Sequence, residues 1–223
     1  MTTPSPAKSR TRSWPVGRTR AVAIAVALAA IPLLMVTLDP VIAHHTVPHH
    51  GSPTIERYLA VTDPLGNAPL IPGLGGALLV AAALCRSKRL ARVGVLVLLT
   101  FALCGGSVYA VKALVRRPRP WAAQEVAWSA ALRDWRYSHD GRTVSFPSGD
   151  VTCAAGLAMI GYLAVGRGRT RYLFFLVPLA STAGRLIGAR HYPSDCLAGL
   201  LLGMAMAALA WRLWPEPPPD DLR

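Results

Sequence analysis

The amino-acid sequence predicts an all-α fold, a bundle of six transmembrane helices with a short interfacial helix in the first outer loop. Two observations lead to this expectation. Of the 223 residues, 52% are hydrophobic, and most of these fall into runs without charge. The formal net charge is nevertheless +13, with the basic residues gathered between the apolar runs. Soluble domains are rarely so apolar, and nucleic-acid-binding proteins display their basic residues on an exposed face, so lipid is the expected solvent.

Six uncharged, apolar runs account for the predicted helices. They cover residues 21–38, 68–85, 93–111, 151–165, 172–184 and 196–211. A helix needs about 20 mostly apolar residues to cross a bilayer core, and the first three runs come close to that length. The last three are shorter, and polar residues adjoin each of them at the end that we place outside. Because ionisable groups at membrane depth face the interior of a bundle, this pattern predicts helices whose outer ends surround a polar site.

The basic residues predict the orientation of the bundle, because short cytoplasmic loops collect Lys and Arg. Five basic residues lie in the N-terminal tail, four follow the second helix and three follow the fourth. Both termini are therefore expected in the cytoplasm. Residues 1–20 form a basic cytoplasmic tail, residues 21–214 the transmembrane domain, and residues 215–223 a second tail that is expected to be disordered.

The second outer loop departs from this charge rule. Between positions 112 and 150 the basic residues are Lys112, Arg116, Arg117, Arg119, Arg133, Arg136 and Arg142. The first outer loop, from Asp39 to about Asn67, has only Arg57. An excess of positive charge on the outer face requires a local reason, and the simplest is an anion to bind.

The first apolar run has an alternative interpretation as a cleavable signal peptide that ends at Val41-Ile42-Ala43. Its 18 uncharged residues exceed the usual length of about 7 to 15 for the apolar part of such a peptide. We therefore expect the first helix to be retained. Its cleavage would leave five helices with the same outer site.

Phosphate-binding chemistry gathers at the outer ends of the third and fourth helices. Lys112 ends the third helix, and Arg119-Pro120 follows it. An arginine fork donates two hydrogen bonds to a phosphate, whereas lysine supplies a compact charge. The fourth helix opens with Pro147-Ser148-Gly149-Asp150, and the free N–H groups of a helix N-terminus favour an anion. Taken alone, either feature is more typical of an interfacial anchor or a capped helix.

A histidine and an aspartate lie at the start of the sixth helix. His191 comes six residues after Arg185, and Asp195 comes four residues after His191. Four residues make one helical turn, although Pro193 makes a non-helical turn equally compatible. A carboxylate on one ring nitrogen raises the basicity of the other, which can then act as a nucleophile. An isolated pair is more often structural, but three polar elements on one membrane face predict an anion site.

These elements, in this order and spacing, resemble the type 2 phosphatidic acid phosphatase (PAP2) superfamily of membrane-bound lipid phosphate phosphatases. Lys112 and Arg119-Pro120 match its K-x6-R-P element, Pro147-Ser148-Gly149 matches most of P-S-G-H, and Arg185, His191 and Asp195 match R-x5-H-x3-D. The resemblance covers the third to sixth helices. It implies a cell-membrane enzyme with six helices, independent of metal or any other cofactor. Such an enzyme hydrolyses lipid phosphomonoesters or diphosphates at the outer face through a phosphohistidine intermediate.

The resemblance also implies a role for each matching residue. His191 would attack phosphorus, and Asp195 would orient its ring. The nonbridging oxygens would be held by Lys112, Arg119, Ser148, Gly149 and Arg185. These roles agree with the chemistry of phosphoryl transfer, which demands positioning and charge stabilisation.

Two positions depart from the family pattern. Gly184 stands where the family usually has Ser, so one supporting hydrogen bond is expected to be missing. Asp150 stands where the family has His as the general acid for the leaving group. A carboxyl can fill that role only if burial or negative charge raises its pKa from about 3.9, and nearby arginines act in the opposite direction.

Four interpretations of the second departure are open. Asp150 is the acid, a neighbour such as His139 replaces it, or the substrate is a diphosphate whose leaving phosphate needs little protonation. The fourth is an enzyme of low activity, which is less favoured because the nucleophile and the three cationic groups are intact. The expected partner is a lipid phosphate in the membrane and not a nucleic acid. Phosphatidic acid, phosphatidylglycerol phosphate, polyprenyl diphosphate and a lipid-linked sugar phosphate all fit, and no motif selects among them or indicates an oligomeric state.

Two functions outside lipid phosphate hydrolysis fit the same residues. A lipid phosphotransferase would pass the phosphoryl group to another lipid, and a transport or binding protein would hold the anion without hydrolysis. The cluster His44, His45, His49 and His50 suggests zinc, but no cysteine or carboxylate lies at ligand spacing, so no metal is expected. Residues 54–61 repeat apolar side chains at helical spacing, which predicts the interfacial helix.

Overall fold

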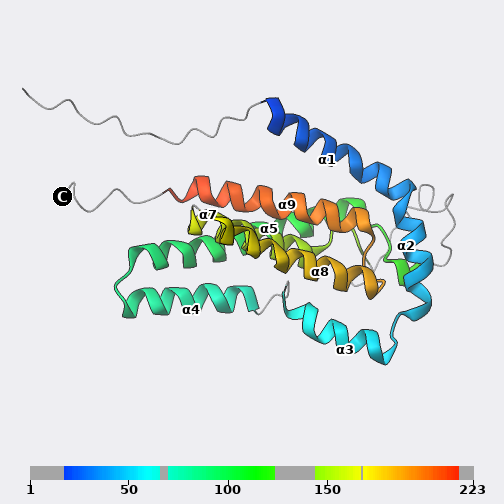
Figure 1. The fold of residues 1–223 in the computed structure, drawn as a ribbon, viewed down its shortest axis with the longest axis horizontal. Helices are drawn as coiled ribbons and strands as arrows, with labels where there is room; N and C mark the ends of the chain where they lie inside the picture. Colours follow the sequence, from blue (N-terminus) through cyan, green and yellow to red (C-terminus); the bar gives the residue numbers. More distant parts are fainter. Residues whose placement is uncertain (1–17, 66–69, 124–143, 167, 216–223) are drawn as a thin grey trace, which may run out of the picture.

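The computed structural model describes residues 18–65, 70–123, 144–166 and 168–215 (Figure 1). Its α-helices are α1 (Arg18–Val36), α2 (Leu38–Thr46), α3 (Pro53–Thr62), α4 (Leu70–Leu84), α5 (Lys88–Val115), α7 (Gly149–Val165), α8 (Leu176–Ile187) and α9 (Pro193–Leu213). The 3-10 helices are η1 (Val47–His49), η2 (Asp63–Leu65), η3 (Pro120–Ala122) and η4 (Arg169–Phe175). Among these residues the only β-structure is one isolated bridge between Pro118 and Val144, so the predicted all-α class is confirmed.

Each of the six apolar runs is helical over most of its described residues. Among the described helices, two or three qualify as membrane spans. Helices α5 and α9 are long and apolar enough to cross a bilayer. Helices α1 and α2 together form a third candidate, bent by 52° where they meet. Helices α4 and α7 are apolar but shorter. The topology of six spans and the cytoplasmic position of both termini stay predictions.

The bend after α1 turns α2 across the ends of α8 and α9. Thr37 separates the two helices, and its hydroxyl donates to the carbonyl of Leu33 at 2.7 Å. Figure 1 shows α2 running across the ends of α8 and α9, and it contacts both helices. The first residues of α2 are thereby brought to the start of α9, and Asp39 is buried there.

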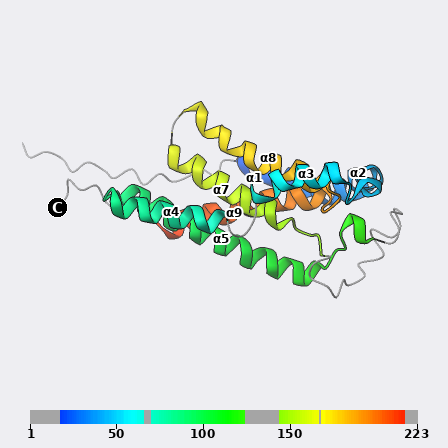
Figure 2. The same cartoon turned by 90° about the horizontal axis from the view of Figure 1, so that it is seen from below.

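The central helices α7 and α9 pack with their backbones unusually close. Figure 2 shows this pair between α5 on one side and α8 on the other. A Cβ atom at Gly199 would lie 2.8 Å from the carbonyl oxygen of Ser148, and one at Gly203 would collide with the carbonyl of Thr152. Small residues four positions apart allow this approach in membrane helices. The N-terminus of α7 therefore lies beside the first turn of α9, where Ser148 donates its N–H to the carbonyl of Asp195 at 3.1 Å.

The helix predicted over residues 54–61 is present as α3, which is one residue longer at each end. Leu59 and Thr62 are buried on the face that packs against α8, while Tyr58 and Val61 are exposed. This amphipathic pattern is typical of a helix at a membrane surface. Its position at the interface stays a prediction.

We expect Gly203→Val to lower the stability of the protein, because no space exists for the added side chain between α7 and α9. Overpacking of this kind costs about 1–3 kcal/mol. The measurement is thermal unfolding of the full chain in detergent. Gly105→Val is the matched control, since a Cβ there meets no atom within 4 Å. Equal shifts of the melting temperature in the two variants would contradict the close packing.

Candidate active site

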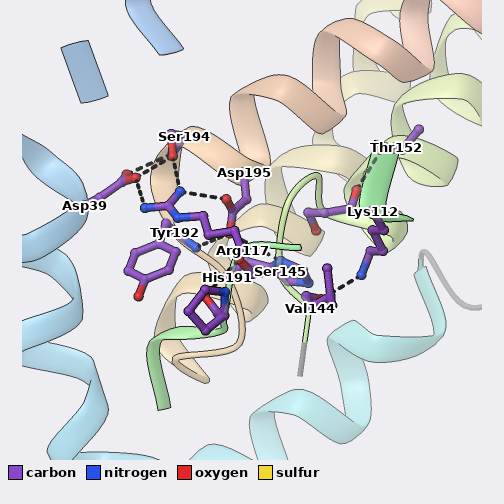
Figure 3. A network of polar contacts seen from close by, with 12 residues as sticks. Asp39, Lys112, Arg117, Val144, Ser145, Thr152, His191, Tyr192, Ser194 and Asp195 are labelled. Carbon is purple, nitrogen blue, oxygen red and sulfur yellow. Dashed lines mark hydrogen bonds and ion pairs between the residues drawn. The ribbon is translucent and has the colours of Figure 1, made fainter. Parts of the chain in front are cut away.

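The predicted site residues lie at one end of the bundle, where four segments meet. Lys112 is in the last turn of α5, and Ser148 precedes the first residue of α7. Arg185 is in the last turn of α8, and His191 lies in the connection to α9. These are the C-terminal ends of α5 and α8 and the N-terminal ends of α7 and α9. Residues far apart in the sequence therefore converge as predicted, and Figure 3 shows several of them.

His191 is a buried side chain, 3% exposed, in a turn that ends where α9 begins at Pro193. The turn is therefore the alternative that the structure adopts. Its Nδ1 atom lies 3.6 Å from Oδ2 of Asp195, which is longer than a hydrogen bond, and has no other hydrogen-bond partner. Burial lowers the pKa of His191, and the charges of Arg119 and Lys112 act in the same direction, against the opposing effect of Asp195. The ring is therefore neutral at pH 7 and retains the lone pair of a nucleophile.

Asp195 is held in one orientation by two hydrogen bonds. Its Oδ1 accepts from Nη1 of Arg117 at 2.8 Å, and its Oδ2 accepts from the backbone N–H of Tyr192 at 2.9 Å. The second bond closes the N-terminal turn of α9, since Asp195 is the third residue of that helix. The oxygen nearest to His191 thus has a fixed position. His191 and Asp195 are neighbours, as their spacing predicts, but their nearest polar atoms are 3.6 Å apart and form no hydrogen bond.

Arg117 is a central residue that the sequence did not single out from its basic cluster. It is 6% exposed and pairs with Asp195 and with Asp39 at 2.8 Å each, while its guanidinium lies 3.8 Å from the ring centre of Tyr192 (Figure 3). Burial lowers the pKa of Arg117, but the two carboxylates outweigh it and the pKa is raised. Asp39 belongs to α2. Cleavage after Ala43 would therefore remove a residue of this network, contrary to the expectation that it would leave the outer site unchanged.

Two predicted phosphate ligands have polar atoms without a partner. Nε of Arg119 and Oγ of Ser148 are both buried and make no hydrogen bond. Ser148 occupies the N-cap position of α7, yet its hydroxyl forms no capping bond. Burial lowers the pKa of Arg119, and the nearby Arg185 and Arg190 add to this effect, whereas Asp150 opposes it. Unpaired buried polar atoms are rare, and a guanidinium and a hydroxyl that both lack an acceptor fit an anion that supplies one to each.

The other two cations are already paired. Nζ of Lys112 donates to the carbonyl of Val144 at 2.9 Å. Nη2 of Arg185 lies 3.1 Å from Oδ2 of Asp150 and 3.2 Å from Oδ1 of Asp63. Asp63 comes from η2 and was not expected at the site. Asp150, the residue at the family's general-acid position, is thus in contact with a predicted phosphate ligand, while the alternative His139 lies outside the described residues.

The structure explains why glycine, and not the family's usual serine, stands at position 184. A Cβ atom at this position would collide with the hydroxyl of Thr62 on α3 and would lie 3.0 Å from the Thr62 Cβ atom. The serine that the family usually has here would occupy the same space. The departure from the family pattern therefore accompanies the close packing of α3 on α8.

The histidine cluster of the first outer loop contacts protein groups. His50 Nδ1 lies within hydrogen-bonding distance of the carbonyl of Gly188, at 2.8 Å, and its ring stacks on Trp121 with 5.4 Å between centroids. His44 and His45 contact each other edge to face. Within the part of the chain that the structure describes, no group of three or more potential metal ligands converges.

Comparison with protein families identifies the class of this protein. The PAP2 superfamily matches residues 93–218, which is more than half of the chain and includes every predicted site residue. The chain therefore belongs to the PAP2 superfamily, whose members are phosphatases. The family and the apolar helices together indicate a membrane protein. Searches of curated proteins and of solved structures gave no match.

We expect His191 to titrate below the ordinary histidine pKa of about 6.5, because burial and two cations disfavour its charged form. The ring is then still mostly neutral at about pH 6.5, where an ordinary histidine is half protonated, and it takes up its proton only at lower pH. Nuclear magnetic resonance of ring-labelled histidine in the full chain measures the midpoint, and His191→Gln assigns the signal. A midpoint at or above 6.5 would contradict this environment.

We expect Gly184→Ser to destabilise the protein by about 1–3 kcal/mol, because the added side chain overlaps Thr62. The same substitution in a Thr62→Ala background should cost less, since the overlapping hydroxyl is gone. Thermal unfolding of the unchanged protein, the two single variants and the double variant in detergent gives the coupling energy between positions 62 and 184. Additive effects would show that α3 does not pack against residue 184 as described.

Proposed function

We propose that the chain is an integral membrane phosphatase that removes phosphate from a lipid phosphomonoester or diphosphate at the outer membrane face. The observation that carries the proposal is a buried, neutral His191 beside Asp195, close to two groups with unpaired polar atoms, Arg119 and Ser148. A nucleophile and an adjacent anion site are the two requirements of phosphoryl transfer through a covalent intermediate.

Substrate binding would complete the hydrogen bonds that are missing in the free site. Arg119 and Ser148 can donate to phosphate oxygens without losing an existing partner. The N–H of Gly149, at the start of α7, adds a donor with the favourable dipole of a helix N-terminus. Arg185 would exchange Asp63 and Asp150 for the phosphate, and Lys112 would add a further positive charge.

The reaction would proceed in two displacements at phosphorus. The lone pair of the Nε2 atom of His191 forms a bond to phosphorus as the bond to the leaving oxygen breaks, and the leaving group takes up a proton. The ring becomes cationic, with its Nδ1 proton facing Asp195. Water then attacks the phosphohistidine, which releases inorganic phosphate and returns His191 to its neutral form. Neither step requires a metal ion or another cofactor.

Asp150 is the group best placed to donate the first proton. Its side chain is 30% exposed at the first turn of α7 and contacts Arg185. Phosphate binding would draw Arg185 away and place negative charge beside Asp150, which favours the protonated carboxyl that a general acid requires. A diphosphate substrate has a much better leaving group than an alkoxide and depends less on this proton.

The distribution of basic residues supports an active site on the extracytoplasmic side. Lys112 lies near the C-terminal end of α5, and the basic connection of residues 86–92 lies at its opposite end. Short loops rich in Lys and Arg face the cytoplasm. A lipid substrate is supported by the exposed apolar side chains of α1, α4 and α8, which suit a bilayer.

We expect His191→Ala to abolish phosphate release from a lipid phosphate, because the nucleophile is lost. Asp150→Asn should lower the rate for monoesters by about 10²- to 10⁴-fold, the range of general acid catalysis, and for diphosphates by less. The assay is phosphate release in detergent from phosphatidic acid, phosphatidylglycerol phosphate, polyprenyl diphosphate and a lipid-linked sugar phosphate. EDTA should leave the rate unchanged.

Three controls separate the alternatives. Glu56→Gln removes a carboxylate that lies 3.6 Å from Arg190 at an exposed position, and it should retain activity. Equal and mild losses for both substrate classes would show that Asp150 is not the acid. An acceptor lipid in the assay detects phosphoryl transfer, and binding without any release of phosphate would indicate a transport or binding protein instead.

A further inference from the structure

Arg117 joins two carboxylates from opposite ends of the chain, and only one of them faces His191. Asp195 binds Nη1 of Arg117, and Asp39 binds Nη2 (Figure 3). Ser194 closes the cluster, since its hydroxyl accepts from Arg117 at 2.7 Å and donates to Asp39, and its N–H donates to Asp39 at 3.0 Å. The side chains of these residues are between 0% and 7% exposed.

The arrangement solves an electrostatic problem of the His191–Asp195 pair. A guanidinium that fixes Asp195 also weakens the negative charge that Asp195 presents to the imidazole ring. The second carboxylate, Asp39, compensates Arg117, so the three charged groups together carry one negative charge. Buried charges are tolerated when they are paired and hydrogen-bonded, and each member of this cluster meets that condition.

We propose that Arg117 and Asp39 are positioning residues for the nucleophile. Arg117 fixes the carboxylate of Asp195, and Asp39 preserves the net negative charge that stabilises His191 as its ring becomes a cationic phosphohistidine. This inference rests on the proposed phosphatase function. It also adds a part of the chain outside residues 93–218 to the catalytic apparatus, because Asp39 belongs to α2.

Other charged groups also act on His191 and must stay constant in the test. Lys112 and Arg119, from the end of α5 and the segment after it, disfavour its protonation, and Asp195 in α9 favours it. Arg117 and Asp39 act through Asp195. Substitutions at positions 39 and 117 leave Lys112 and Arg119 unchanged, so a change in the titration of His191 reports the charge of the cluster.

The test compares the full chain with Asp39→Asn and with the double variant Asp39→Asn/Arg117→Gln, in detergent. Asp39→Asn removes the net negative charge, so the titration midpoint of His191 should fall by about one pH unit. The kcat for phosphate release should fall by about 10- to 100-fold with little change in KM. The magnitude is taken by analogy from metal sites, where loss of a group that orients a ligand has an effect of this size. The double variant restores the original net charge, and its midpoint should return toward that of the unchanged protein.

Several outcomes overturn the proposal. If the titration midpoint of His191 is unchanged in Asp39→Asn, Asp39 has only a packing role, even if kcat is lower. The same conclusion follows if the midpoint in the double variant does not return toward that of the unchanged protein. Glu56→Gln, which removes a carboxylate outside the cluster, should not move the midpoint. If the unchanged protein releases no phosphate from any lipid, the proposed function fails, and the histidine titration still decides whether Asp39 sets the charge beside His191. Thermal unfolding of each variant confirms that it is folded.

Discussion

The buried carboxylate of Asp195 is the group on which the rest of the site depends. Its two oxygens accept hydrogen bonds from Arg117 and from the backbone N–H of Tyr192, and Oδ2 lies 3.6 Å from Nδ1 of His191. A single side chain therefore closes the first turn of α9, binds the segment after α5 and faces the candidate nucleophile. A buried carboxylate with this many donors has one favourable position. The position of the carboxylate that faces His191 is therefore defined, and phosphoryl transfer requires such positioning.

This geometry is possible because α7 and α9 approach closely. Gly199 and Gly203 place the start of α7 against the first turn of α9, and Ser148 thereby binds the backbone of Asp195. Larger side chains at the two glycines would separate the helix N-terminus from the histidine. The packing of the membrane helices and the assembly of the anion site are thus one structural feature. The segment between α1 and α4 adds two further carboxylates, Asp39 beside Arg117 and Asp63 beside Arg185.

The sequence predicted the helices and the converging polar residues because both leave strong local signals. Uncharged runs mark helices in lipid, and Lys112, Ser148 and His191 each stand at the end of such a run. The roles of Arg117, Asp39 and Asp63 left no such signal. Arg117 lay within a run of arginines that all looked alike, and the two aspartates lay in an outer loop whose path back to the helices depends on the bend after α1. Long-range ion pairs depend on tertiary packing, which periodicity and spacing do not encode.

The most direct measurement of the central claim is the chemical identity of the phosphorylated residue during turnover. The full chain is mixed with a phosphate-labelled lipid, quenched under alkaline conditions that preserve phosphohistidine, and digested for mass spectrometry. The proposed mechanism predicts the phosphoryl group on the peptide that contains His191. Label on a different residue, or continued phosphate release by a chain that lacks this histidine, would contradict it.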